Sequence, residues 1–146
     1  MKFTWSQFKK AKEPTTVGRF IVVDLPLLGI EAIDAKVDTG AFSGALHASN
    51  IREVTDDDGV KHLHFNPLAS KDHTLEVDHY HRREVKSSNG ETQSRYAFDT
   101  EVEILGQRYP LTLTLSNRSS MKYQMLIGRK FLQTHGFLVD VSINSK

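Results

Sequence analysis

The sequence contains no cysteine, no long apolar run and no excess of charge of either sign. Without cysteine, the chain has no disulfide, no thiolate metal site and no cysteine nucleophile. No segment approaches the roughly 18 apolar residues of a membrane span, and the polar N-terminus lacks the apolar core of a signal peptide. The 19 basic and 18 acidic residues argue against nucleic acid or a membrane surface as the main partner. We therefore expect a soluble, cytoplasmic protein.

The chain has 146 residues, which is the size of a single compact domain. A lysine-rich segment, residues 1–16, is predicted to be a polar N-terminal arm, and residues 17–146 are predicted to form one domain. Short apolar runs separated by turn residues predict strands over residues 19–25, 30–37, 45–48, 51–55, 60–65, 75–86, 93–105, 109–115, 125–127 and 137–141. One short helix is expected over residues 128–133, with Gly136 near its C-cap. This pattern favours a mainly β fold, a closed barrel or a sandwich.

Two hairpins and one half-buried strand are marked by specific residues within this pattern. Asp58-Gly59 and Asn89-Gly90 each lie between strand-like runs, and such pairs are strong hairpin signals. Leu111, Leu113 and Leu115 alternate with threonines, and this period of two is typical of a half-buried strand.

The run Asp38-Thr39-Gly40-Ala41 follows an apolar strand and carries the candidate catalytic carboxylate, Asp38. Two carboxylates that share one proton push their pKa values apart, so one can deprotonate water while the other protonates a carbonyl oxygen. Thr39 would lock such a pair through its hydroxyl, Gly40 would let the backbone approach the carboxylate, and Ala41 would keep the substrate side open. An Asp-x-Gly after a strand is also a common turn, so this tetrapeptide alone leaves both interpretations open.

A second segment strengthens the catalytic interpretation. Residues 124–136 read QMLIGRKFLQTHG, an apolar triplet followed by Gly128-Arg129 and a short helix. This segment resembles the C-terminal segment of retroviral proteases. The resemblance implies a closed retropepsin-like (acid protease) barrel in which the apolar strand packs beside the Asp-Thr-Gly loop. It also implies that the arginine braces the active-site end of the barrel.

A closer resemblance covers nearly the whole chain. It rests on the following residues: Lys36 to Ala41 with Ser43, Ala45 to Ala48, Arg83, Val85 to Gly90, Arg95, and Met125 to Arg129. They are similar to a bacterial family commonly labelled ATP-dependent zinc proteases. The family is linked by gene neighbourhood to an ATP-grasp ligase that adds glutamate to a ribosomal protein. The resemblance implies a retropepsin-like peptidase, and the label raises the questions of ATP and zinc.

Neither cofactor has a clear motif in the sequence. No glycine-rich phosphate loop is present, so no ATP site is expected. The pairs His62, His64 and His79, His81 each place two imidazoles on one face of a strand, and Asp72, His73 or Asp78 would supply a third ligand. The simpler interpretation is that these histidines face solvent in polar hairpins. We expect no cofactor, and keep His62, His64, His79 and His81 as the alternative metal site.

Only one Asp-Thr-Gly motif is present, so an aspartic peptidase built on this chain requires a homodimer with Asp38 of each copy at the two-fold axis. The hairpin tip formed by Lys86, Ser87, Ser88, Asn89 and Gly90 is the candidate lid over a peptide substrate. Arg83, Lys86 and Arg95 flank this lid. They would attract an acidic peptide, or they are solvated strand charges.

Three functions follow from these observations. The first is an aspartic endopeptidase acting as a homodimer, with a peptide or protein substrate that is acidic or glutamate-modified. The second is a zinc-dependent hydrolase that uses the histidine pairs. The third is a non-catalytic retropepsin-fold domain that binds a partner or only dimerises. The sequence does not identify the substrate or the cleavage site.

Overall fold

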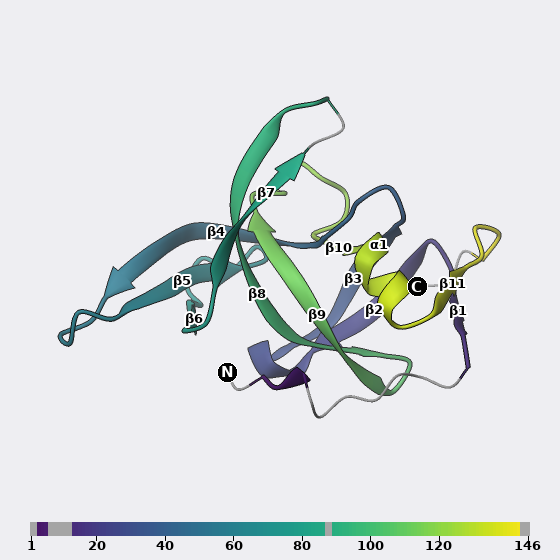
Figure 1. Cartoon of the computed structure of the whole chain (residues 1–146), viewed down its shortest axis with the longest axis horizontal. Coiled ribbons are helices and arrows are strands. Elements are labelled where there is room, and N and C mark those ends of the chain that lie inside the picture. The colour runs from purple at the N-terminus through teal and green to yellow at the C-terminus, as the bar shows by residue number, and fades with distance from the viewer. Residues whose placement is uncertain (1–2, 6–12, 87–88, 144–146) are drawn as a thin grey trace.

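The computed structural model describes residues 3–5, 13–86 and 89–143 (Figure 1). Its strands are β1 (Thr15–Val17), β2 (Phe20–Leu25), β3 (Ile30–Asp38), β4 (Gly44–Thr55), β5 (Lys61–Pro67), β6 (Leu75–Val77), β7 (His81–Lys86), β8 (Thr92–Ile104), β9 (Gln107–Ser116), β10 (Met125–Gly128) and β11 (Phe137–Val139). A 3-10 turn, η2 (Pro26–Leu28), follows β2, and the helix α1 (Arg129–Thr134) follows β10. The prediction of a mainly β fold with a short helix near the C-terminus is confirmed.

The main sheet returns on itself. Its strands pair in the order β10–β3–β2–β8–β9–β4, and β4 pairs again with β10, so these strands form a ring. Two of the pairings are parallel, β10 with β3 and β4 with β9, and the others in the ring are antiparallel. The ring places the end of β3 beside the start of β4, where the Asp38 motif lies.

Two extensions leave the ring (Figure 1). The long antiparallel pair β4 and β5 continues outward with β6 along its edge, and we call this three-stranded extension the arm. The second extension is the β7–β8 hairpin, in which His81 pairs with Ala97 and Lys86 with Thr92. In Figure 1 the arm projects to one side and the paired strands β7 and β8 extend upward, each away from the ring.

The core of the ring is filled by alternating side chains of its strands. Ile33, Ala35 and Val37 of β3 are buried, as their period of two predicts. Phe65 and Phe98 are both fully buried and stack with ring centroids 5.7 Å apart, which joins the base of the arm to β8. The burial of such side chains, about 1.5–3 kcal/mol for each large apolar group, is the main force that holds the ring closed.

Strand boundaries differ from the prediction at two places. Residues 45–48 and 51–55 belong to the single strand β4, in which the register shifts between Ser49 and Arg52 and Asn50 has a φ of 51°. This irregularity interrupts the apolar pattern without ending the strand. Residues 75–86 form two strands, because β6 pairs with β5 whereas β7 pairs with β8.

The two ends of the described chain both contact the domain. β1 begins at Thr15 and pairs in parallel with β11, so the strand starts inside the segment predicted as an arm. Near the N-terminus, Trp5 Nε1 donates a hydrogen bond to Asp99 Oδ2 of β8 at 3.1 Å. No helix in the described part of the chain has the length and hydropathy needed to cross a bilayer.

Candidate active site

Asp38 is the last residue of β3, and the chain turns immediately after it. The backbone N–H of Gly40 donates to Asp38 Oδ1 at 3.0 Å, and the N–H of Ala41 donates to the Asp38 carbonyl at 3.2 Å. Asp38 is half-buried, whereas Thr39 and Gly40 are exposed. The turn therefore fixes one carboxylate oxygen through the backbone and leaves the loop open on its outer side.

The strand β10 lies between β3 and β4 and places the Ile127-Gly128-Arg129 segment beside Asp38. Met125 pairs with Ala35 on one side and with Leu46 on the other, and Gly128 pairs with Asp38. Met125 and Ile127 are fully buried, so their apolar side chains hold β10 in place. The predicted contact between the Asp38 loop and the Ile127-Gly128-Arg129 segment is present.

Gly128 is required because the loop after Asp38 passes directly over it. A Cβ atom at this position would lie 2.6 Å from the carbonyl carbon and oxygen of Ser43 and 2.7 Å from the carbonyl oxygen of Phe42. Just beyond this contact, the Arg129 N–H donates to the Ala41 carbonyl at 2.7 Å and the Lys130 N–H donates to the Phe42 carbonyl at 3.1 Å. The first N–H groups of α1 are thus satisfied by the loop that follows Asp38.

The Arg129 side chain braces the same loop. Its Nη1 donates to the Thr39 carbonyl at 3.3 Å, and its guanidinium carbon lies 5.5 Å from the centre of the Phe42 ring. A cation above an aromatic face is attracted by the ring quadrupole. Arg129 therefore holds both ends of the turn that carries Asp38.

Residues 16–145 match a protein family described as RimB-like, retropepsin-like aspartic endopeptidase RimB. The chain belongs to the RimB-like family. A solved structure shares the fold: protein Lpg0085 of unknown function from Legionella pneumophila aligns with a TM-score of 0.72 and 25% identity. That alignment covers 92% of this chain and 98% of the Legionella chain.

Curated relatives of this RimB-like chain carry a different name. A probable alpha-L-glutamate ligase of Shewanella pealeana is 38% identical over 80% of this chain, and one of Parasynechococcus marenigrum is 35% identical over 73%. The alignments cover 26% and 24% of those proteins. The chain thus spans about a quarter of the length of the curated relatives it matches.

The candidate lid of this RimB-like chain is the β7–β8 hairpin. Lys86 ends β7, and Asn89 and Gly90 are exposed, with Asn89 Oδ1 accepting the Glu91 N–H at 3.1 Å. Ser87 and Ser88, which the sequence also assigns to the lid, lie outside the described residues. Lower on the hairpin, Arg83 Nη1 donates to Ser43 Oγ at 3.2 Å. This bond ties the hairpin to the loop that follows Asp38.

Arg118 is close enough to both Arg95 and Asp38 for their charges to act on it. Arg118 lies in the segment between β9 and β10, where its N–H donates to His47 Nδ1 at 2.8 Å and its Nε donates to the Tyr123 carbonyl at 3.2 Å. Burial and the charge of Arg95 lower the pKa of Arg118, and the negative charge of Asp38 opposes them. Burial also lowers the pKa of Arg95. No local sequence motif marks Arg118, so it was not among the predicted site residues.

The four histidines of the alternative metal site have separate surroundings in the structure. His62 lies between Asp56 and Asp78, His64 bonds Glu76, and His79 and His81 are exposed. His62 and His64 are half-buried, so they do not simply face solvent. Of these four histidines, only His62 joins a group of three candidate metal ligands within the described residues. Hydrogen bonds that the His62 ring donates to Asp56 and Asp78 raise the pKa of His62 to about 9.

Proposed function

We propose that this chain is an aspartic endopeptidase whose catalytic pair consists of Asp38 from two copies of the chain. The observation that carries the proposal is the joint position of the two motifs. β10 brings Gly128 opposite Asp38, and Arg129 braces the loop that carries the carboxylate. Membership of a family described as retropepsin-like aspartic endopeptidases supports the same activity.

The homodimer follows from the chemistry of the reaction. One carboxylate has to remove a proton from water while another donates a proton to the peptide carbonyl, and the two exchange roles in the next turnover. The sequence contains one Asp-Thr-Gly run. The exposed outer side of the turn at Thr39 and Gly40 is where a second copy would bring its own Asp38.

The proposed substrate is an extended peptide with acidic side chains near the cleaved bond. Arg95 and Arg118 are half-buried, and Asp38 is close enough for its charge to act on Arg118. Half-buried cations attract a carboxylate more strongly than solvated ones, because water screens them less. The ligases named above contain a segment similar to this chain within a longer protein. A glutamate-extended peptide, the kind of product that such a ligase makes, is therefore the substrate class we assign.

The main test replaces Asp38 by Asn and measures cleavage of a peptide ending in several α-linked glutamates, followed by mass spectrometry. Asp34 lies on the same strand and is exposed, so Asp34→Asn is the matched control. We expect D38N to abolish cleavage and D34N to keep it. Cleavage by D38N at the wild-type rate would exclude the proposed chemistry.

Assembly and specificity are tested separately. Sedimentation analysis measures the fraction of dimer at each protein concentration. The rate of cleavage should rise with that fraction, since a monomer carries half of the catalytic pair. Arg118→Gln should reduce kcat/KM for the glutamate peptide by at least about tenfold, which corresponds to roughly 1.4 kcal/mol. It should affect a matched glutamine peptide much less. An equal loss on both peptides would remove Arg118 from substrate recognition and leave the catalytic proposal intact.

A further inference from the structure

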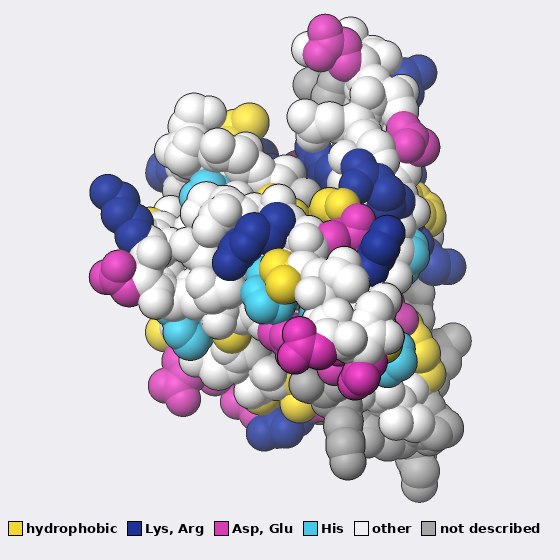
Figure 2. Space-filling view, turned by 90° about the vertical axis from the view of Figure 1, so that its left-hand side faces the viewer, with side chains coloured by type: hydrophobic (Ala, Val, Ile, Leu, Met, Phe, Trp, Pro, Cys, Tyr) yellow, Lys and Arg dark blue, Asp and Glu magenta, His cyan; other side chains and the backbone are white. Residues whose placement is uncertain are grey.

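The arm carries a cluster of histidines and carboxylates that the peptidase chemistry does not use. Its members are His62 and His64 of β5, Glu76 of β6, Asp78 just after β6, and Asp56 at the β4–β5 turn. Figure 2 views the molecule from the side of the arm and shows histidine and acidic side chains lying side by side on that face. The arm projects away from the end of β3, so this cluster is separate from Asp38 (Figure 1).

The imidazole of His62 is held from one side by a rigid acceptor. Its Nε2 lies 2.8 Å from Asp56 Oδ2. Asp56 is itself fixed, because its Oδ1 accepts the N–H groups of Asp58 and Val60, each at 2.9 Å. Asp56 orients the ring through Nε2, so Nδ1 is the nitrogen that faces Asp78.

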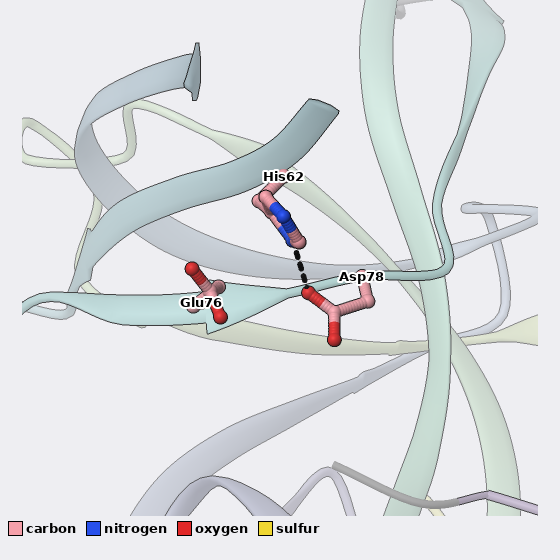
Figure 3. A group of neighbouring side chains, drawn as sticks. All are labelled: His62, Glu76 and Asp78. Atoms are coloured by element: carbon pink, nitrogen blue, oxygen red, sulfur yellow. Dashed lines mark hydrogen bonds and ion pairs between the residues drawn. The ribbon is translucent and has the colours of Figure 1, made fainter. Parts of the chain in front are cut away.

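The other nitrogen of His62 faces more negative charge. Nδ1 lies 2.6 Å from Asp78 Oδ1, and Glu76 offers a further oxygen, so that the ligand atoms of His62, Glu76 and Asp78 all lie within 4.8 Å of one another (Figure 3). Without an ion, a proton on Nδ1 makes this contact a hydrogen bond, and a divalent cation that replaced this proton would be attracted by both carboxylates. The protonated ring carries a single positive charge beside two carboxylates, whereas a divalent ion in place of the proton would carry two.

Glu76 is oriented by a second histidine. His64 Nε2 lies 2.9 Å from Glu76 Oε1, and the side chain of His64 is only 23% exposed. The arrangement therefore has an inner set, His62 Nδ1 with the carboxylates of Glu76 and Asp78, and an outer set, Asp56 and His64, that orients it. Metal sites in proteins have this two-layered construction, in which outer partners fix the tautomer and the direction of the ligands.

We propose that His62, Glu76 and Asp78 bind one divalent transition-metal ion, with Zn²⁺ the ion that the site favours. One imidazole nitrogen and two carboxylate oxygens are ligands that Zn²⁺ accepts, at about 2.0–2.2 Å, and water completes its tetrahedral set. Imidazole disfavours Mg²⁺ and Ca²⁺, which prefer oxygen ligands throughout. The ion would link β5 to β6 and the residue after it, and so stabilise the pairing of these two strands of the arm.

The test is a calorimetric titration of the metal-free full-length chain with Zn²⁺ alone, together with thermal unfolding with and without the ion. Wild type should bind one equivalent and unfold at a higher temperature with Zn²⁺, because a ligand of the folded state stabilises it. His62→Gln, Glu76→Gln and Asp78→Asn should each weaken binding at least about tenfold. His79→Gln is the matched control, since His79 is exposed and adjacent to Asp78, and it should bind like wild type.

Two results would overturn the assignment. One is the absence of saturable binding by wild type at Zn²⁺ concentrations up to about 1 mM. The other is binding that E76Q and D78N leave unchanged, which would place the ion elsewhere. These two variants keep the contact between His62 and Asp56, so the test remains decisive if H62Q fails to fold. Neither result bears on the peptidase proposal, whose test uses Asp38.

Discussion

Gly128 lies opposite Asp38 at the ends of two parallel strands, β10 and β3. At position 128, any Cβ atom would point directly at the backbone of Phe42 and Ser43. The loop after the carboxylate can approach β10 only because nothing projects from position 128. The geometry of the candidate active site thus depends on a residue that has no functional group.

Replacing Gly128 by Ala should destabilise the protein by about 1–3 kcal/mol, the usual cost of forcing an extra carbon into a packed site. The clash is with backbone atoms of Ser43 and Phe42, which cannot rotate away. Chemical denaturation would measure the loss. Gly44→Ala is a milder comparison, because its Cβ would lie 3.2 Å from its nearest neighbours. Equal stability of G128A and wild type would contradict the tight contact.

Replacing Arg129 by Gln should lower the melting temperature by a few degrees and reduce peptide cleavage. The substitution removes the cation–π contact with Phe42, worth about 0.5–1 kcal/mol at an exposed site, and the bond to the Thr39 carbonyl. Arg19→Gln is the control, since Arg19 is also exposed and lies 5.4 Å from the centre of the Phe20 ring. Cleavage should fall in R129Q alone. A similar fall in cleavage by R19Q would show that the loss in R129Q does not come from the loop that carries Asp38.

Replacing Arg83 by Gln should reduce kcat/KM by roughly tenfold, because a hydrogen bond to a charged group contributes about 1.5–3 kcal/mol. The bond from Arg83 to Ser43 joins the β7–β8 hairpin to the active-site loop. Its neighbour Arg82 bonds Ser94 and stacks over Tyr96 within the hairpin instead. Arg82→Gln should therefore leave steady-state cleavage near the wild-type value. If R82Q and R83Q lose activity equally, the hairpin as a whole is responsible.

His135 should titrate below its ordinary pKa of 6.5, because burial beside Phe131 and Tyr109 disfavours its charged form. The bond to the Pro110 carbonyl opposes this shift but is the smaller influence. Since folding lowers the pKa, the neutral ring contributes stability above about pH 6.5 that is lost as the pH falls through the folded value. NMR titration gives the pKa directly. His135→Phe should flatten the acid side of the stability profile, and a measured pKa at or above 6.5 would refute the expectation.

The strands of this protein are predicted well where one face is apolar, and less well where neighbours cover both faces. Leu111, Leu113 and Leu115 predict β9 correctly through their period of two. Thr114, expected on the exposed side, is also buried and donates to the Gly44 carbonyl at 2.9 Å. β9 lies between β8 and β4, and the sequence does not show that both sides of a strand are occupied.

The candidate site is predicted from the sequence only where a local motif marks it. Asp38 and Arg129 belong to short runs whose residue types indicate their chemistry. Arg118 belongs to no such run, and it reaches the site because its backbone bonds His47, which is distant in sequence. Asp78 was one of the partners considered for the histidine pairs, but Asp56 and Glu76 were not, since they come from a turn and from another strand. Spacing along one strand predicts which side chains share a face, but it does not identify their partners on the next strand.

The position of β10 has a consequence for the order in which the candidate active site can form during synthesis. Thr39 and Arg129, which are joined by a hydrogen bond, are 90 residues apart in the chain. While the ribosome is still making β9, the facing edges of β3 and β4 have no strand between them, and the turn at Asp38 has no brace. Closing so long a loop is entropically costly and slow. The turn at Asp38 in a nascent chain therefore lacks its brace until the last strands emerge.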